Sequence, residues 1–71
     1  MKPGDLVIRS NPFGGDVIKD LGGSQWEMAG VRVPYNDLAL ILEVQHDRSL
    51  LKILWKGGSS YVSWCGFEVV M

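Results

Sequence analysis

Residues 50–70, which read LLKILWKGGSSYVSWCGFEVV, decide the fold of this chain. Leu51, Ile53 and Trp55 are two residues apart, and side chains at that spacing lie on one face of a β-strand. Gly57-Gly58 follows, and a glycine pair suits the type I′ turn of a β-hairpin, which needs positive φ at both central residues. The pattern therefore predicts the first arm of a hairpin and its turn.

The rest of this stretch continues in the same way. Residues 60–64 return as the second arm of the hairpin, and residues 64–66 form a tight corner that suits a single 3-10 turn. Residues 67–70 form a last short strand. Three consecutive short strands joined by tight turns are typical of a very small β-barrel.

Two further strands are predicted earlier in the chain. Residues 6–9 follow a Pro-Gly-Asp turn, and Val7 and Arg9 would share one face of the strand. Residues 38–44, LALILEV, could form a helix on propensity alone, because Ala and Leu favour helices. We favour a strand, because alternate residues from Leu38 to Val44 are all apolar, whereas Glu43 interrupts the other set of alternate residues.

The segment of about residues 10–36 is the irregular part of the chain. Pro12 and Pro34 bracket it, and glycine pairs interrupt it. A loop of this length in a compact domain usually has structure of its own or a function. Two short apolar pieces, residues 17–18 and 26–29, would suit the arms of an irregular hairpin.

Size and composition exclude several classes of protein. We expect one domain, residues 1–71, whose size allows it to bury only about 60% of the surface that the unfolded chain exposes. One cysteine and one histidine exclude an internal disulfide and a Cys/His zinc site within one chain. The net charge of −1 differs from the basic excess of most nucleic-acid binders.

The same composition bears on location. No apolar run approaches the roughly 20 residues that span a bilayer, and no apolar signal-peptide segment follows the N-terminal MKPGD. A free cysteine suits a reducing compartment. We therefore expect a cytoplasmic protein without membrane contact.

The order of one strand, a long loop, three strands joined by short turns, a corner and a last short strand is that of an SH3-like barrel. The chain resembles the small, uncharacterised SH3-like proteins of tailed bacteriophages, notably those of marine cyanobacteria. The residues that carry this resemblance are KPGDLV at 2–7, ILEV at 41–44, KILW at 52–55, YVSW at 61–64 and FEVV at 67–70. The resemblance implies an all-β fold, a small SH3-like five-stranded barrel with a long irregular loop after the first strand. It also implies that a phage-encoded chain is located in an infected host cell or a virion, but it implies no activity.

Four aromatic residues are candidates for a partner-binding groove between the long loop and the barrel. They are Trp26, Tyr35, Tyr61 and Trp64. Aromatic side chains at such a place would hold an extended peptide or stack against a base. In the simpler alternative, Trp55, Trp64 and Phe67 fill the core of the barrel and the other aromatics hold the loop in place.

No pattern in the chain is typical of a catalytic, cofactor-binding or metal site, so we predict that it is not an enzyme. His46 and Cys65 could act as base and nucleophile, but their spacing does not bring them together and no third group orients them. The acidic residues are scattered and lack the spacing of a calcium-binding loop.

Apolar residues on the second face of the C-terminal strands indicate an association surface. Leu50, Leu54 and Val62 have the opposite parity from the predicted core residues of this region, so they would face outward. A monomer rarely leaves an apolar patch of several hundred Å² exposed. We therefore expect a homo-oligomer or a docking surface for another protein.

Three hypotheses for function follow. The leading one is a non-enzymatic protein–protein interaction or assembly module. The first alternative is a small-barrel nucleic-acid-binding protein, since Lys52 and Lys56 flank Trp55, although two lysines are few for that role. The second alternative is an enzyme whose site forms at the centre of a symmetric oligomer, around Tyr61 and Ser63. None of these hypotheses requires a cofactor.

Overall fold

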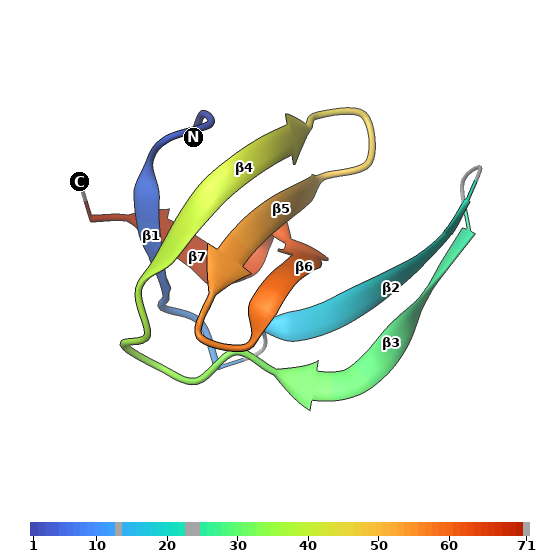
Figure 1. The fold of residues 1–71 in the computed structure, drawn as a ribbon, viewed down its shortest axis with the longest axis horizontal. Coiled ribbons are helices and arrows are strands. Elements are labelled where there is room, and N and C mark those ends of the chain that lie inside the picture. Colours follow the sequence, from blue (N-terminus) through green and yellow to red (C-terminus); the bar gives the residue numbers. More distant parts are fainter. Residues whose placement is uncertain (13, 23–24, 71) are drawn as a thin grey trace.

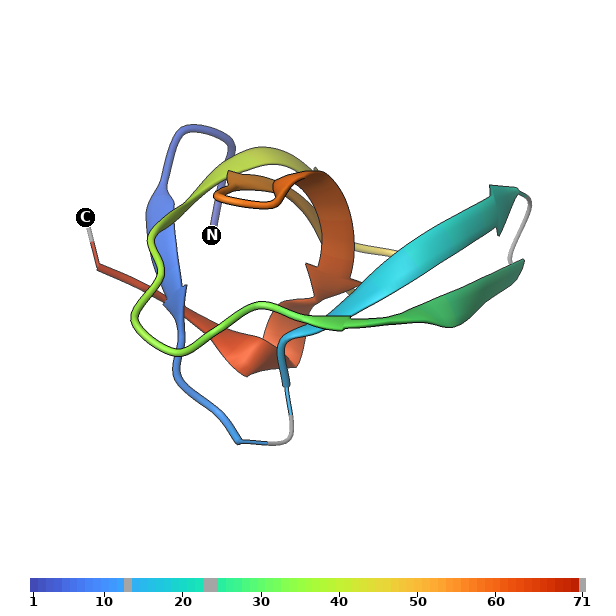
Figure 2. The same ribbon diagram turned by 60° about the horizontal axis from the view of Figure 1, so that its bottom comes forward.

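The computed structural model of this protein describes residues 1–12, 14–22 and 25–70. Within these residues, seven strands form one antiparallel sheet that curls into a half-barrel, with a single 3-10 turn before the last strand (Figures 1 and 2). The elements are β1 (Leu6–Arg9), β2 (Asp16–Gly22), β3 (Gln25–Arg32), β4 (Ala39–Gln45), β5 (Leu50–Trp55), β6 (Gly58–Ser63), η1 (Trp64–Gly66) and β7 (Phe67–Val69). The strands lie in the order β3-β2-β6-β5-β4-β1-β7. The predicted all-β fold is confirmed.

Strands β4, β5 and β6 form the predicted meander, but the turn between β5 and β6 differs from the prediction. Trp55 pairs with Gly58, so Lys56 and Gly57 connect the two strands. Of the glycine pair, only Gly58 has a positive φ, at 102°, so the predicted type I′ turn is wrong. A single positive-φ residue after a tight turn is the arrangement of a bulged hairpin. Gly57 is needed for space, because a Cβ there would lie 2.5 Å from the Trp55 ring.

The segment predicted as an irregular loop contains a paired hairpin, β2–β3, which projects from the curled sheet (Figure 2). Ile18 pairs with Met28 on β3, and on its other side β2 pairs with β6 through Ile18 and Tyr61. The prediction of five strands is therefore corrected to seven. The physical reason is that pairing satisfies the backbone N–H and C=O groups that an irregular loop would leave open. The interpretation of residues 17–18 and 26–29 as hairpin arms is confirmed.

The core lies inside the curl of the sheet. Its buried members are Val7, Val33, Ala39, Ile41, Leu51, Ile53, Val62 and Phe67. Trp55 and Trp64 are partly buried and pack against this cluster, as the simpler alternative for the aromatic residues expected. The Trp55 indole N–H donates to the Ser60 hydroxyl at 3.1 Å, so this ring is held by packing and by a hydrogen bond.

The predicted outward face of the C-terminal strands is mostly wrong. Leu50 and Val62 are buried, and of the three predicted residues only Leu54 is exposed, by 48%. Val62 is the cross-strand partner of Leu51 and therefore shares its inward face. Leu50 stands at the start of β5 and lines a groove together with side chains of the β2–β3 hairpin.

In the described part of the chain, no helix is long and apolar enough to cross a bilayer.

Candidate partner-binding groove

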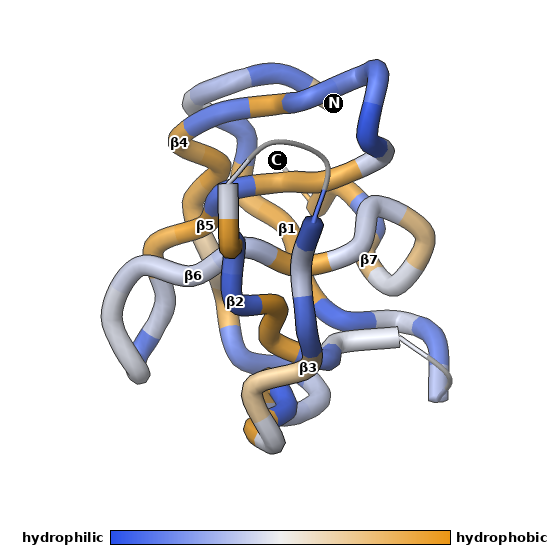
Figure 3. The backbone as a smooth tube through the Cα atoms, turned by 90° about the vertical axis from the view of Figure 1, so that its right-hand side faces the viewer, coloured by the Kyte–Doolittle hydropathy of each residue, from blue (hydrophilic) through white to orange (hydrophobic). Residues whose placement is uncertain are grey.

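A groove of about 240 Å³ lies between the β2–β3 hairpin, the β4–β5 connection and η1. Its apolar lining residues are Ile18, Trp26, Met28 and Leu50. We call it the hairpin groove. Strands β2 and β3 carry both apolar and charged residues (Figure 3), so the hairpin has polar surface as well as the apolar groove wall. The lining of the hairpin groove therefore contains both apolar and polar residues.

The wall and the floor of the hairpin groove come from different strands. Trp26 and Met28 are two residues apart on β3 and share its groove face; they are 46% and 58% exposed. Ile18, the cross-strand partner of Met28, is buried beneath them. Leu50, from the start of β5, is also buried and completes the floor. Two large exposed side chains thus stand beside a buried aliphatic floor.

An ion pair ties the hairpin to the β4–β5 connection at one side of the groove. The Arg48 guanidinium donates to both Asp20 carboxylate oxygens, at 3.2 and 3.3 Å. It also donates to the side-chain oxygen of Gln45 at 3.3 Å. The Arg48 hydrogen bond lowers the pKa of Asp20 below its ordinary value of 3.8. This pair fixes the position of the hairpin relative to the rest of the sheet.

The neutral polar groups of the groove are two hydroxyls and a thiol. Ser49 adopts a positive φ of 54°, and its carbonyl accepts a hydrogen bond from the Trp64 N–H at 3.0 Å. The Ser63 hydroxyl and the Cys65 thiol lie 3.3 Å apart. Serine hydroxyls both donate and accept hydrogen bonds, so they can meet the backbone of a bound segment.

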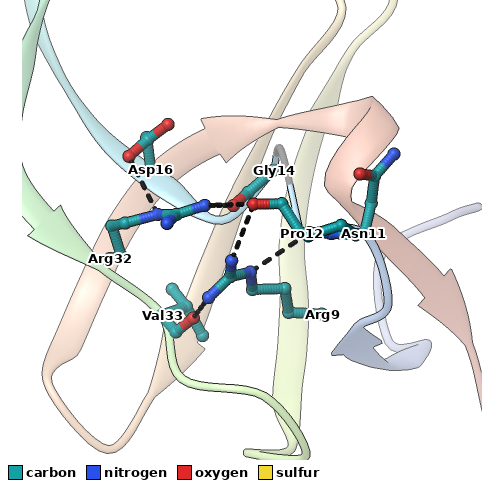
Figure 4. Close-up of polar contacts among 7 residues, drawn as sticks. All are labelled: Arg9, Asn11, Pro12, Gly14, Asp16, Arg32 and Val33. Atoms are coloured by element: carbon teal, nitrogen blue, oxygen red, sulfur yellow. Dashed lines mark hydrogen bonds and ion pairs between the residues drawn. The ribbon is translucent and has the colours of Figure 1, made fainter.

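The base of the hairpin is held by Arg9, which is 6% exposed (Figure 4). Its guanidinium donates to the carbonyl oxygens of Val33 at 3.1 Å, Pro12 at 3.1 Å and Asn11 at 3.3 Å. Three carbonyl acceptors replace the water that a guanidinium loses on burial. One side chain thus joins β1, the segment before β2 and the segment after β3.

Arg32 reinforces the same junction from the end of β3 (Figure 4). Its Nη2 donates to the carbonyl oxygens of Pro12 at 2.6 Å and Gly14 at 2.9 Å. Its Nε lies 3.3 Å from an Asp16 carboxylate oxygen. Because two guanidinium groups share the Pro12 carbonyl, the start and the end of the hairpin are fixed to each other.

The structure places one of the four aromatic candidates in the hairpin groove. Trp26 lines it, whereas the other three contact different partners. Tyr35 lies under the Arg9 guanidinium at 4.1 Å, Tyr61 lies 5.7 Å from the Lys52 ammonium, and Trp64 makes an edge contact with His46 at 5.1 Å. The sequence reasoning missed Ile18, Met28 and Leu50, although the spacing of Trp26 and Met28 was a signal for a shared strand face.

His46 and Cys65, the two residues considered for catalysis, contact other side chains. The His46 ring packs against Trp64, and the exposed Cys65 thiol lies at the groove beside Ser63. Among residues 1–12, 14–22 and 25–70, no three His, Cys, Asp or Glu side chains gather closely enough to hold a metal ion. The hairpin groove thus offers apolar contact, a few neutral hydrogen-bonding groups and two charged side chains, Asp16 and Arg48, that are paired within the chain.

The chain was compared with protein families, curated proteins and solved structures. A scan against protein-family models, a search of curated proteins and a search of solved structures found no match to this chain. The function proposed below therefore rests on the groove itself.

Proposed function

We propose that this protein is a non-enzymatic protein–protein interaction module. In this proposal, the hairpin groove binds one or two apolar side chains of an extended segment of a partner protein. The observation that carries the proposal is the groove wall of Trp26 and Met28, two large side chains exposed beside a buried aliphatic floor. Exposed aromatic and methionine side chains at such walls are typical anchors of protein interfaces.

The volume of the groove favours side chains of a larger partner over a small molecule. Sites that enclose drug-sized ligands usually measure about 300–1,000 Å³. The hairpin groove, at about 240 Å³, is smaller than that range. An extended segment would insert a side chain or two and leave the rest of its chain on the surface.

The charges of the groove favour apolar side chains over charged ones. Both charged lining residues have partners within the chain, because Asp16 pairs with Arg32 and Arg48 pairs with Asp20. A charged ligand would have to break one of these pairs or lose its own water without compensation. The hydroxyls of Ser49 and Ser63 would instead meet backbone groups of the bound segment.

We also propose the finer fold assignment. In it, β1, β4, β5, β6 and β7 are the five strands of an SH3-like barrel, and β2–β3 is the long hairpin that follows its first strand. The order of the elements and the 3-10 turn before β7 support this assignment. The resemblance to phage proteins, with an infected cell or a virion as the location, is part of the same proposal.

A peptide selection tests the proposed function. A displayed library of random linear peptides is panned against the immobilised protein, and enriched peptides are titrated into isotope-labelled protein by NMR. We expect enriched peptides to share a large apolar residue and to shift the signals of the Trp26 indole and the Met28 methyl group. We expect Trp26→Ala to weaken binding at least about tenfold, as loss of an interface anchor does.

Leu21→Ala is the matched control, because Leu21 lies on the same hairpin, is 51% exposed and does not line the groove. It should leave the affinity unchanged. Binding should also slow the reaction of the Cys65 thiol with a thiol reagent, since Cys65 lines the groove. The proposal fails if no peptide is enriched, or if Leu21→Ala and Trp26→Ala weaken binding equally.

A further inference from the structure

A second apolar surface lies on the outer side of the sheet, away from the hairpin groove. Leu40 on β4 pairs with Leu6 on one side and with Leu54 on the other. The Val70 N–H donates to the Leu6 carbonyl at 2.9 Å, which continues the same row beyond β7. Four aliphatic residues thus lie side by side across four adjacent segments.

Neighbouring positions extend this row into a patch. Leu38, which is 58% exposed, is two residues from Leu40 and lies on the same face. Ile8 is two residues from Leu6 and also lies on that face. Leu42 is exposed at the register shift between Ile41 and Glu43. We call the whole patch the leucine face; it consists of Leu6, Ile8, Leu38, Leu40, Leu42, Leu54 and Val70. Leu38, Leu42, Leu54 and Val70 are exposed, and the other three residues are half-buried. A contiguous exposed aliphatic patch often marks an interaction site.

The charges at the two margins of the leucine face have opposite signs. Glu68 on β7 pairs with Ile8 and is exposed at one margin. Lys56 follows β5 and is exposed at the other margin. Neither side chain forms an ion pair within the described residues. A rotation that exchanges the two margins would therefore bring opposite charges together.

We propose that the leucine face binds the same face of a second copy of this chain. The two-fold axis lies in the interface, roughly along the strands, so that Glu68 of each copy meets Lys56 of the other. Such an interface is isologous, because each copy contributes the same patch. In this arrangement the strands of the two sheets run in nearly the same direction, as they do in most pairs of sheets that pack face to face.

The size of the patch sets the strength of this dimer. Stable interfaces bury about 800 Å² on each partner, with an apolar centre and a polar rim. Seven aliphatic residues with two rim charges provide the centre of a small interface of this kind. The dimer is therefore reversible, and the protein passes from monomer to dimer as its concentration rises.

Charge reversal tests the dimer and its orientation. The dissociation constant is measured by sedimentation over a wide range of protein concentration, with folding checked by circular dichroism. Glu68→Lys and Lys56→Glu each weaken the dimer about fivefold, because each replaces an attraction with a repulsion. The double variant, with both reversals, restores the affinity of the unchanged protein.

The apolar centre is tested with a matched pair. Leu54→Gln, at 48% exposure on the leucine face, weakens the dimer, whereas Leu21→Gln, at 51% exposure on the hairpin, does not. A protein that stays monomeric at all concentrations overturns the proposal. A dimer that tolerates Leu54→Gln, or is not restored by the double charge reversal, overturns it as well.

Discussion

At the scale of single residues, Arg9 is the buried cation that joins three segments of the chain. No carboxylate pairs with it among the described residues; three carbonyl oxygens and the ring of Tyr35 surround it. A guanidinium suits this environment, because its planar fork presents several donors in fixed directions and its face stacks on aromatic rings. A buried charge is tolerated there because each of the three guanidinium nitrogens donates to a carbonyl oxygen.

We expect Arg9→Lys to reduce the free energy of unfolding by about 2–4 kcal/mol, because a lysine ammonium cannot reach the same carbonyls in a fork. Chemical denaturation measures this change. Arg32→Lys is the control, since Arg32 also donates to the Pro12 carbonyl but is exposed, and it should cost less than about 1 kcal/mol. Equal losses in the two variants would contradict the structural role given to Arg9.

The Asp20–Arg48 pair has a pH signature. Because Arg48 hydrogen-bonds the Asp20 carboxylate, the folded-state pKa of Asp20 lies below 3.8. The stabilisation from this group is therefore complete above pH 3.8 and is lost as the pH falls through the folded-state pKa. NMR titration of the Asp20 carboxyl carbon should show a midpoint below 3.8 that rises in Arg48→Gln. Asp5, whose pKa is lowered by Lys2, should not respond to that substitution; an unchanged Asp20 midpoint would refute the assignment.

At the scale of elements, β3 is an exposed edge strand with a built-in irregularity. All eight of its residues are exposed, and among the described residues it pairs only with β2. Asp16 pairs with Arg32 and Ile18 with Met28, so three residues of β3 lie opposite one residue of β2. Gly30, inside this bulge, has a positive φ of 78°. Bulges of this kind disrupt the regular edge that another strand could pair with.

Hydrogen exchange should rank the strands by their place in the sheet. Strand β5 lies between β4 and β6, so its amides should exchange only on global unfolding. The amides of β3 should exchange faster, through local opening of the hairpin, because this strand lies at the edge of the sheet that the described strands form. Measurement of native-state exchange by NMR checks this order. Equal protection of β3 and β5 would mean that the hairpin unfolds only with the whole domain.

At the scale of the whole molecule, a direct backbone contact joins the segment before β2 to the 3-10 turn before β7. A Cβ on Gly14 would lie 2.2 Å from the Cα of Gly66, so the segment before β2 and the 3-10 turn touch through their backbones. The Ser10 N–H donates to the Gly66 carbonyl at 3.0 Å, and the Val33 N–H donates to the Gly15 carbonyl at 2.7 Å. The hairpin base is thus fixed against the C-terminal end of the sheet.

We expect Gly14→Ala to cost about 3 kcal/mol of unfolding free energy, because neither backbone can move without breaking these hydrogen bonds. Gly30→Ala is the control: it meets nothing within 4 Å, and its positive φ alone should cost about 1 kcal/mol. Thermal and chemical denaturation measure both values. A Gly14→Ala protein as stable as Gly30→Ala would show that the closing contact adjusts easily.

Local patterns in the sequence were sufficient for much of the fold. The strand at residues 6–9, the meander of β4–β6 and the 3-10 turn at residues 64–66 were predicted with small errors at their ends. Side-chain alternation and turn residues act over a few positions, so they can be read without knowledge of distant partners. Trp26 was a candidate because it is an aromatic residue in the long segment after the first strand, and the structure places it in the hairpin groove.

Only the tertiary structure decided which faces of these strands are buried and where the hairpin of β2 and β3 lies against the rest of the sheet. Alternation separates two faces but does not say which is inside, so the burial of Arg9, Leu50 and Val62 depended on strands far away in the chain. The hairpin groove likewise requires β2 to pair with β6, a contact between residues more than forty positions apart. Pairing and register across such separations follow from the packing of the whole sheet, and no short window of sequence contains them.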